Sequence, residues 1–188
     1  ENFDDIKAYM FLACPIVHPS VMMRRDVFFK YNIRYDEHYR NMEDYKLWYD
    51  IMQIGKIANI SEPLLFYRIS KEQVSTKYKV NQMIGNKLFR REIMSTYLLS
   101  KGINIDERII NWELIHEISH LKLQTIDDAK MIASILFVCC LSVHDNKGLG
   151  LIKFLYSLVW TKRFFHCKYI GGIIIHYLHL KRLDYLSI

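Results

Sequence analysis

Residues 14–76 read CPIVHPSVMMRRDVFFKYNIRYDEHYRNMEDYKLWYDIMQIGKIANISEPLLFYRISKEQVST. All three prolines of the 188-residue chain lie in this stretch, which alternates short apolar runs with polar turns. Residues 20–24 and 63–69 are predicted to be strands; the second, PLLFYRI, opens with a proline and continues with aromatic and β-branched side chains. The stretch is therefore expected to contain extended as well as helical structure.

A helix is predicted between the two strands, over residues 43–54. Its apolar residues recur with helical spacing on one face, and Gly55 is expected to end it. These residues are Leu47, Trp48, Ile51 and Met52.

Beyond Thr76 the chain contains no proline, and its apolar pattern is helical to the end. We expect helices over residues 78–100, 106–123, 127–143, 148–165 and 172–186. Gly102 is a predicted helix stop, and Asp106, Asp127 and Asp128 are predicted first-turn or capping acids. This change of pattern divides the chain into an α/β segment, residues 1–76, and a mainly helical region, residues 77–188.

The net charge of +6 is concentrated in the tail. Residues 147–188 hold seven Lys and Arg against a single acid, Asp184, whereas the rest of the chain is balanced. Without a dense basic block or a Gly/Ser-rich run, an anionic membrane surface is the expected contact and nucleic acid is not. A helical core with solvated lysines explains the tail equally well. The most apolar run, Met131–Val143, is shorter than the ~20 residues that cross a bilayer.

Cys14, Cys139, Cys140 and Cys167 form no CxxC pair and are expected to be reduced thiols. The first ten residues are acidic where a signal peptide would be basic, which favours a cytoplasmic protein. The chain starts with Glu rather than Met, so it is expected to begin inside a longer protein.

Several blocks of the quoted stretch coincide, in order and spacing, with the second half of the catalytic domain of bacterial family 2 glycosyltransferases. The blocks are His18-Pro19-Ser20-Val21-Met22 with Arg24, Tyr35-Asp36-Glu37, Glu43-Asp44-Tyr45 with Leu47-Trp48, and Glu62-Pro63-Leu64 with Tyr67-Arg68. The segment resembles this family, which includes rhamnosyl-, galactosyl- and glucosyltransferases of surface polysaccharide assembly. The resemblance implies the C-terminal, acceptor-side part of a GT-A domain and an inverting transfer from a nucleotide sugar to a saccharide or lipid-linked acceptor. It also implies a setting at the inner face of a bacterial plasma membrane.

The resemblance identifies Asp44 as the catalytic base and Glu43 as its neighbour. An inverting transfer needs a carboxylate that takes the proton of the acceptor hydroxyl while the oxygen attacks the anomeric carbon. Two acids at a helix start would also complement the helix dipole without any catalytic role.

Four further residues are candidates for substrate binding. Arg24 and Arg68 suit phosphate or acceptor oxygens, although surface ion pairs are an equally good interpretation. His18 precedes a proline, is held extended and is expected to line the pocket or to be structural. Trp48 could stack on a sugar, but its helical spacing favours the core.

Two departures from the family affect the cofactor. Many members carry a His after the Tyr-Arg pair, where this chain has Ser70, and the Asp-x-Asp half that binds nucleotide and metal is absent from the sequence. A divalent cation, Mg²⁺ or Mn²⁺, is expected for the complete enzyme, with ligands mostly outside this chain. The QxxRW motif of processive synthases is also absent, which favours transfer of single sugars.

Two alternatives remain open. His116-Glu117-Ile118-Ser119-His120 matches HExxH, the zinc metallopeptidase motif in which two His bind zinc and Glu activates water. No Gly-x-x-His follows, so a third ligand would have to be a nearby Asp or a distant His; an amphipathic helix also explains the motif. The second alternative is a non-catalytic helical module that docks on a membrane or a partner enzyme.

The isolated chain is expected to be inactive in sugar transfer, because the nucleotide-binding half is missing from it. Release of nucleoside diphosphate from nucleotide sugars by the purified chain is the measurement. Turnover by the chain alone would contradict the expectation.

Overall fold

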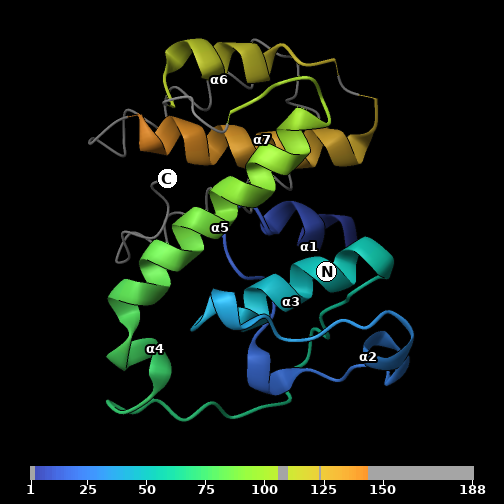
Figure 1. The fold of residues 1–188 in the computed structure, drawn as a ribbon, viewed down its shortest axis with the longest axis vertical. Coiled ribbons are helices and arrows are strands. Elements are labelled where there is room, and N and C mark those ends of the chain that lie inside the picture. The colour runs from blue at the N-terminus through green and yellow to red at the C-terminus, as the bar shows by residue number, and fades with distance from the viewer. Residues whose placement is uncertain (1–2, 106–109, 123, 144–188) are drawn as a thin grey trace.

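In the computed structural model, residues 3–105, 110–122 and 124–143 are described. Their elements, in chain order, are α1 (Phe3–Tyr9), η1 (His18–Ser20), α2 (Asp26–Lys30), η2 (Glu37–Tyr39), α3 (Glu43–Ile54), α4 (Val74–Lys77), α5 (Lys79–Leu99), α6 (Trp112–Ser119) and α7 (Ile126–Ser142). Figure 1 shows these helices stacked and crossing, with long loops between the shorter ones.

The predicted α/β fold class is wrong for the described residues, which contain helices and loops but no strand. Residues 63–69 form a loop. Ser20 is the last residue of η1, and residues 21–24 have no regular structure. The sequence pattern marks chain that favours an extended backbone, but a strand exists only when its N–H and C=O groups pair with a neighbour. Neither segment has such a partner in the described part of the chain.

Helix α7 lies between α6 and α1 in Figure 1 and packs against both of them. Its side chains from Met131 to Leu141 are almost all inaccessible to solvent, which explains why this run is apolar on every face. Thr125 caps the helix, because its hydroxyl oxygen accepts a hydrogen bond from the Asp128 N–H at 3.1 Å. The helix predicted over 127–143 is thus confirmed.

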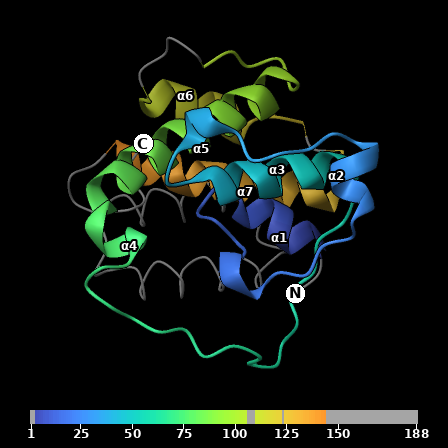
Figure 2. The same ribbon diagram turned by 60° about the horizontal axis from the view of Figure 1, so that its bottom comes forward.

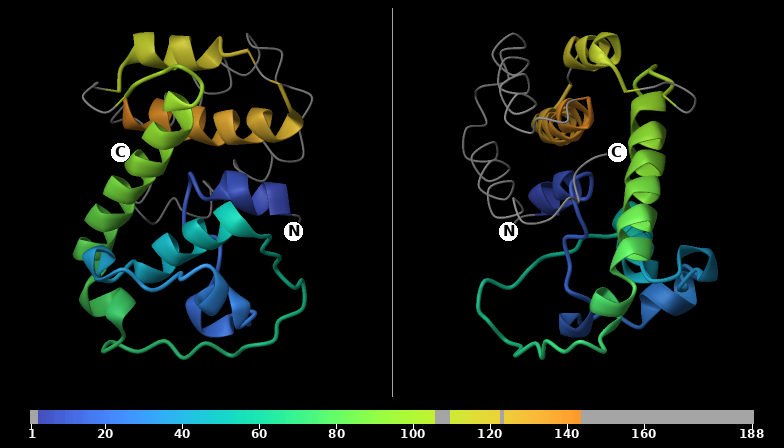
Figure 3. Two further views of the ribbon diagram at one scale, coloured as in Figure 1. Left: turned by 45° about the vertical axis from the view of Figure 1, so that its right-hand side comes forward. Right: turned by 90° about the vertical axis from the view of Figure 1, so that its left-hand side faces the viewer.

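Helix α5 is the longest described element and runs along the side of the packed helices (Figure 3). It ends as predicted before Gly102, whose φ of 88° lies in the left-handed region that favours glycine. The Ile103 N–H then donates to the Leu98 carbonyl at 2.9 Å, which closes the turn. The predicted helix over 78–100 is confirmed.

Helices α3 and α6 also follow predicted elements. Helix α3 has the predicted bounds, and the Gly55 N–H caps it by donating to the Ile51 carbonyl at 2.9 Å. Helix α6 is shorter than the predicted 106–123, because Asn111 caps its start: the Asn111 side chain accepts from the Leu114 N–H at 2.9 Å.

Phe89 packs α5 against η2 and α3. Its ring lies edge-on to the rings of Tyr39, Tyr45 and Tyr49, at centroid distances between 5.0 and 5.8 Å. Next to it, the buried Arg90 guanidinium donates to the Leu12 carbonyl at 2.8 Å. Such T-shaped pairs and a charge-assisted hydrogen bond fix the approach of α5 to α3 and to the chain after α1.

One continuous set of buried side chains includes residues from both sides of residue 76, from Ile6 to Leu141. The division into 1–76 and 77–188 stays a prediction. The predicted helices over 148–165 and 172–186, the basic tail and Cys167 lie outside the described residues. Cys139 and Cys140 are buried and free, and Cys14 is half-buried and free.

The loop between α3 and α4 carries large apolar side chains that the described structure does not cover. Figure 2 shows it sweeping away from the helices before it returns to α4. Leu64 is 73% exposed, Ile69 82%, and Phe66 fully exposed. Among the described residues, no helix is long and apolar enough to cross a membrane.

Phe89→Ala is expected to lower the free energy of unfolding by about 3–5 kcal/mol, because it removes a buried ring and its three aromatic contacts. Leu88→Ala, at a neighbouring position that is 65% exposed, should change it by about 0.5 kcal/mol or less. Urea unfolding measures both. Equal effects would contradict the packing described here.

Asp128→Asn is expected to cost about 2 kcal/mol of unfolding free energy at pH 7. Burial favours the neutral acid, but Lys101, with Nζ at 2.7 Å, and the Tyr97 hydroxyl, at 2.8 Å, outweigh it and lower the pKa of Asp128 to about 2.

This stabilisation is fully present above the unfolded-state pKa of about 3.9 and is lost as the pH falls through the folded-state pKa. The difference between wild type and Asp128→Asn should therefore shrink between about pH 4 and pH 2. Asp127→Asn on the same helix turn is the control, expected to cost less than about 1 kcal/mol. A pH-independent difference for Asp128→Asn would be the contrary result.

Candidate active site

Asp44 lies in the first turn of α3, where the buried face of the helix and the turn η1 approach each other. The hydrophobic residues Tyr45, Leu47 and Trp48 are buried and anchor this end of the helix. The Asp44 carboxylate remains on the border of the core, with 28% of its side chain exposed. A carboxylate in this place can be reached from solvent while most of its surface is covered by protein.

His18 of η1 faces this carboxylate. Its Nδ1 lies 3.9 Å from Asp44 Oδ2, and its ring stands edge-on to Trp48 at a centroid distance of 5.9 Å. Its Nε2 lies 2.9 Å from the Tyr35 hydroxyl, and the two rings are tilted against each other. The structure therefore brings together Asp44, Glu43, His18 and Trp48, all predicted as site residues, and adds Tyr35.

The pKa of Asp44 is raised above its usual value. Burial is the largest cause, and the Glu43 carboxylate also raises the pKa. The Tyr45 N–H, which donates to Asp44 Oδ1 at 2.8 Å, and His18 act in the opposite direction. A carboxylate with a raised pKa holds a proton more strongly, which suits a general base.

Cys14 is a further neighbour of Asp44. Burial raises the pKa of its thiol to about 12, and the Asp44 charge adds to the shift. Cys14 is thus a neutral thiol at physiological pH. Burial, followed by Asp44 and Glu43, also raises the pKa of Tyr35.

Arg24, Arg68 and Trp48 are also predicted to bind substrate. Arg24 and Arg68 are exposed, and within the described residues neither forms a hydrogen bond or ion pair with Asp44. Trp48 is 2% exposed, so protein atoms cover its ring faces, as its helical spacing indicated.

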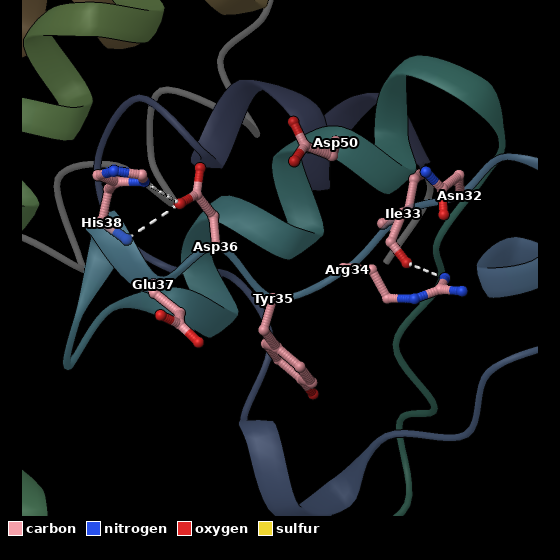
Figure 4. Close-up of a pocket in the computed structure, with 8 residues that line it drawn as sticks. All are labelled: Asn32, Ile33, Arg34, Tyr35, Asp36, Glu37, His38 and Asp50. Atoms are coloured by element: carbon pink, nitrogen blue, oxygen red, sulfur yellow. Dashed lines mark hydrogen bonds and ion pairs between the residues drawn. The ribbon is translucent and has the colours of Figure 1, made fainter.

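A shallow open pocket lies beside the cluster, lined by residues 32–38 and by Asp50 of α3. In Figure 4, Asp36 and His38 point to one side of this segment, where the His38 ring and N–H both contact the Asp36 carboxylate, whereas Tyr35 points to the other side. These contacts lower the pKa of Asp36. The alternation of side chains along the segment thus directs Tyr35 away from Asp36 and His38.

Sequence reasoning gave Tyr35 and Cys14 no role at the site. Tyr35 belongs to one of the blocks that carry the resemblance, but residues 18 and 35 are separated by α2 and its flanking loops. No spacing rule predicts that such positions meet. The signal in the sequence was that His18 and Tyr35 both belong to blocks that carry the resemblance.

The chain is similar to an uncharacterized glycosyltransferase of Haemophilus influenzae. The two are 31% identical over 153 residues, which is 81% of this chain and 45% of the relative. The chain therefore spans less than half the length of this relative. No protein-family profile matches the chain, and no solved structure matches it. The name of this relative gives the reaction class that the sequence blocks indicated, and it specifies neither family 2 nor an inverting mechanism.

The zinc-peptidase motif lies at the C-terminal end of α6, where the His120 N–H donates to the His116 carbonyl at 3.2 Å. Helix α6 ends at Ser119, so His120 follows the helix rather than belonging to it, and its Nδ1 lies 2.8 Å from the His116 carbonyl oxygen. The two imidazole rings face each other at a centroid distance of 4.1 Å. In the described part of the chain, no group of three or more His, Cys, Asp or Glu could hold a metal ion.

Proposed function

We propose that this chain forms the acceptor-side part of an inverting glycosyltransferase of the family 2 kind, with Asp44 as the catalytic base. The observation that carries the proposal is the half-covered Asp44 carboxylate at the start of α3, with a raised pKa and an imidazole beside it. The similarity to a glycosyltransferase supports the reaction class. The four sequence blocks support the family.

In this mechanism the acceptor hydroxyl approaches Asp44 from the solvent side. As its oxygen attacks the anomeric carbon of a nucleotide sugar, Asp44 takes the hydroxyl proton, and the bond from that carbon to the diphosphate oxygen breaks. The nucleoside diphosphate leaves from the opposite face, so the anomeric configuration inverts. Burial helps because a desolvated carboxylate accepts a proton more readily than an exposed one.

Binding roles are proposed for the exposed arginines. Arg24 and Arg68 would meet phosphate or acceptor oxygens, since a guanidinium offers several donors in a fixed plane. Glu43 would orient the acceptor beside Asp44. A divalent cation would neutralise the leaving diphosphate in the complete protein, but the described residues include no group of three ligands for it.

The acceptor is proposed to be a saccharide or a lipid-linked glycan at the inner face of a bacterial plasma membrane. The resemblance to family 2 enzymes supports this setting, together with the basic and apolar composition of the tail, residues 147–188, which lies outside the described residues.

Asp44→Asn in the complete protein is expected to lower kcat by about 10²–10⁴-fold, the usual contribution of a general base. The measurement is the release of nucleoside diphosphate from UDP-glucose, UDP-galactose or dTDP-rhamnose in the presence of membrane lipid extract. Asn cannot accept the proton but keeps the shape of Asp.

Asp50→Asn is the matched control, because Asp50 lies on the same helix and pairs with Lys46 at 2.7 Å instead of His18. It should transfer at about the wild-type rate. If Asp44→Asn retained full activity with an intact fold, Asp44 would not be the base.

A further inference from the structure

We infer that His18 and Tyr35 are positioning residues for Asp44: Tyr35 fixes the imidazole of His18, and the imidazole stands beside the Asp44 carboxylate and favours its ionised form. The inference rests on the proposed function for its catalytic consequence. Its structural part, the coupling among the three side chains, can be measured without any substrate.

The imidazole is held from three sides. Tyr35 contacts Nε2 at 2.9 Å, the Trp48 ring stands edge-on at 5.9 Å, and the Asp44 carboxylate faces Nδ1 at 3.9 Å. The backbone beneath it is also fixed. Ser20 closes the η1 turn, because its N–H and hydroxyl both donate to the Val17 carbonyl, at 3.0 and 2.7 Å.

Tyr35 can hold both forms of the imidazole, because its hydroxyl can donate to Nε2 of the neutral ring or accept from the Nε2–H of the cation. When its hydroxyl donates to Nε2, the remaining proton of the neutral imidazole must lie on Nδ1, the nitrogen that faces Asp44. In functional histidines, a hydrogen bond to one ring nitrogen commonly decides which nitrogen carries the proton. Without Tyr35 the ring could rotate or present a lone pair to the carboxylate, which would repel it.

His18 is the neighbour of Asp44 that can carry a positive charge. Four titratable neighbours face Asp44: Cys14 from the chain after α1, His18 from η1, Tyr35 from the loop before η2, and Glu43 from α3 itself. Cys14 and Tyr35 are neutral or negative, Glu43 is negative, and His18 alone among the four can become a cation. It therefore opposes the burial and the like charge that favour protonated Asp44.

Both side chains are accessible to a ligand, with 43% of the His18 side chain and 43% of Tyr35 exposed. Their position at the border of the core, rather than inside it, separates this arrangement from a purely structural hydrogen bond. An acceptor that approaches Asp44 from solvent would pass beside them.

The experiment is a ¹³C NMR titration of the Asp44 carboxyl in the complete protein labelled at aspartate, assigned by the signal lost in Asp44→Asn. His18→Asn should raise the pKa of Asp44, since the opposing positive charge is removed while a side-chain amide remains. Tyr35→Phe should raise it in the same direction, because the imidazole is no longer fixed. Tyr31→Phe, in the same loop, should leave it unchanged.

The same variants are then compared in the pH dependence of transfer. The base must be ionised to accept a proton, so activity falls as the pH drops through the pKa of Asp44. Both His18→Asn and Tyr35→Phe should therefore move the acidic limb of the kcat profile to higher pH. KM should stay within about twofold, because ground-state binding is not the function removed. Circular dichroism melting confirms that the variants fold.

An unchanged Asp44 titration in His18→Asn would overturn the inference whatever the protein transfers. An unchanged titration in Tyr35→Phe would overturn the part assigned to Tyr35. Retained transfer by Asp44→Asn would refute the proposed function itself, and the two failures are distinguishable because the titration requires no substrate.

Discussion

The contact of Phe89 with three tyrosine rings is the interaction on which the rest of the structure depends. Tyr39 belongs to η2 and so fixes the end of the loop that carries Tyr35, whereas Tyr45 follows Asp44 directly in α3. The Tyr45 hydroxyl in turn donates to the Met10 carbonyl, at the end of α1. A single ring on α5 thus positions both partners that surround His18, and the geometry of the candidate site is set by a helix that contributes no residue to it.

Two arginine side chains of α5 also hold the chain after α1 and the chain after α5 in place. Arg90 reaches the Leu12 carbonyl, and the Arg91 guanidinium donates to the Ile105 carbonyl at 2.9 Å, so α5 is fastened on both sides to chain that lies outside helices. A buried donor that loses its acceptor retains the cost of its lost hydration. The loops around α1 and after α5 are therefore held in place by directional contacts, in addition to apolar packing.

Local pattern was enough to predict α3, α5 and α7. The apolar residues of α3 and α5 repeat every three to four residues and glycines mark their ends, whereas α7 is a long apolar run without proline. It failed where structure depends on distant partners. The strands predicted at 20–24 and 63–69 need neighbours that no local pattern specifies, and the described residues provide none. Asp44, Glu43 and His18 could be named from their blocks, but the approach of Tyr35 to His18 depends on how η1 and the loop before η2 fold together. The helical spacing of Trp48 correctly favoured a core position, because apolar residues that recur on one face of a helix pack against the core.

The uncovered loop after α3 has a consequence for how this polypeptide behaves in a cell. Its chain runs away from the helices in Figure 2, and Leu64, Phe66 and Ile69 are exposed within the part of the chain that the structure describes. Proteases and chaperones both bind extended segments with exposed aromatic and aliphatic side chains, because such chain fits their substrate grooves without unfolding. The loop is therefore a place where a protease can cut while the helical core is still folded.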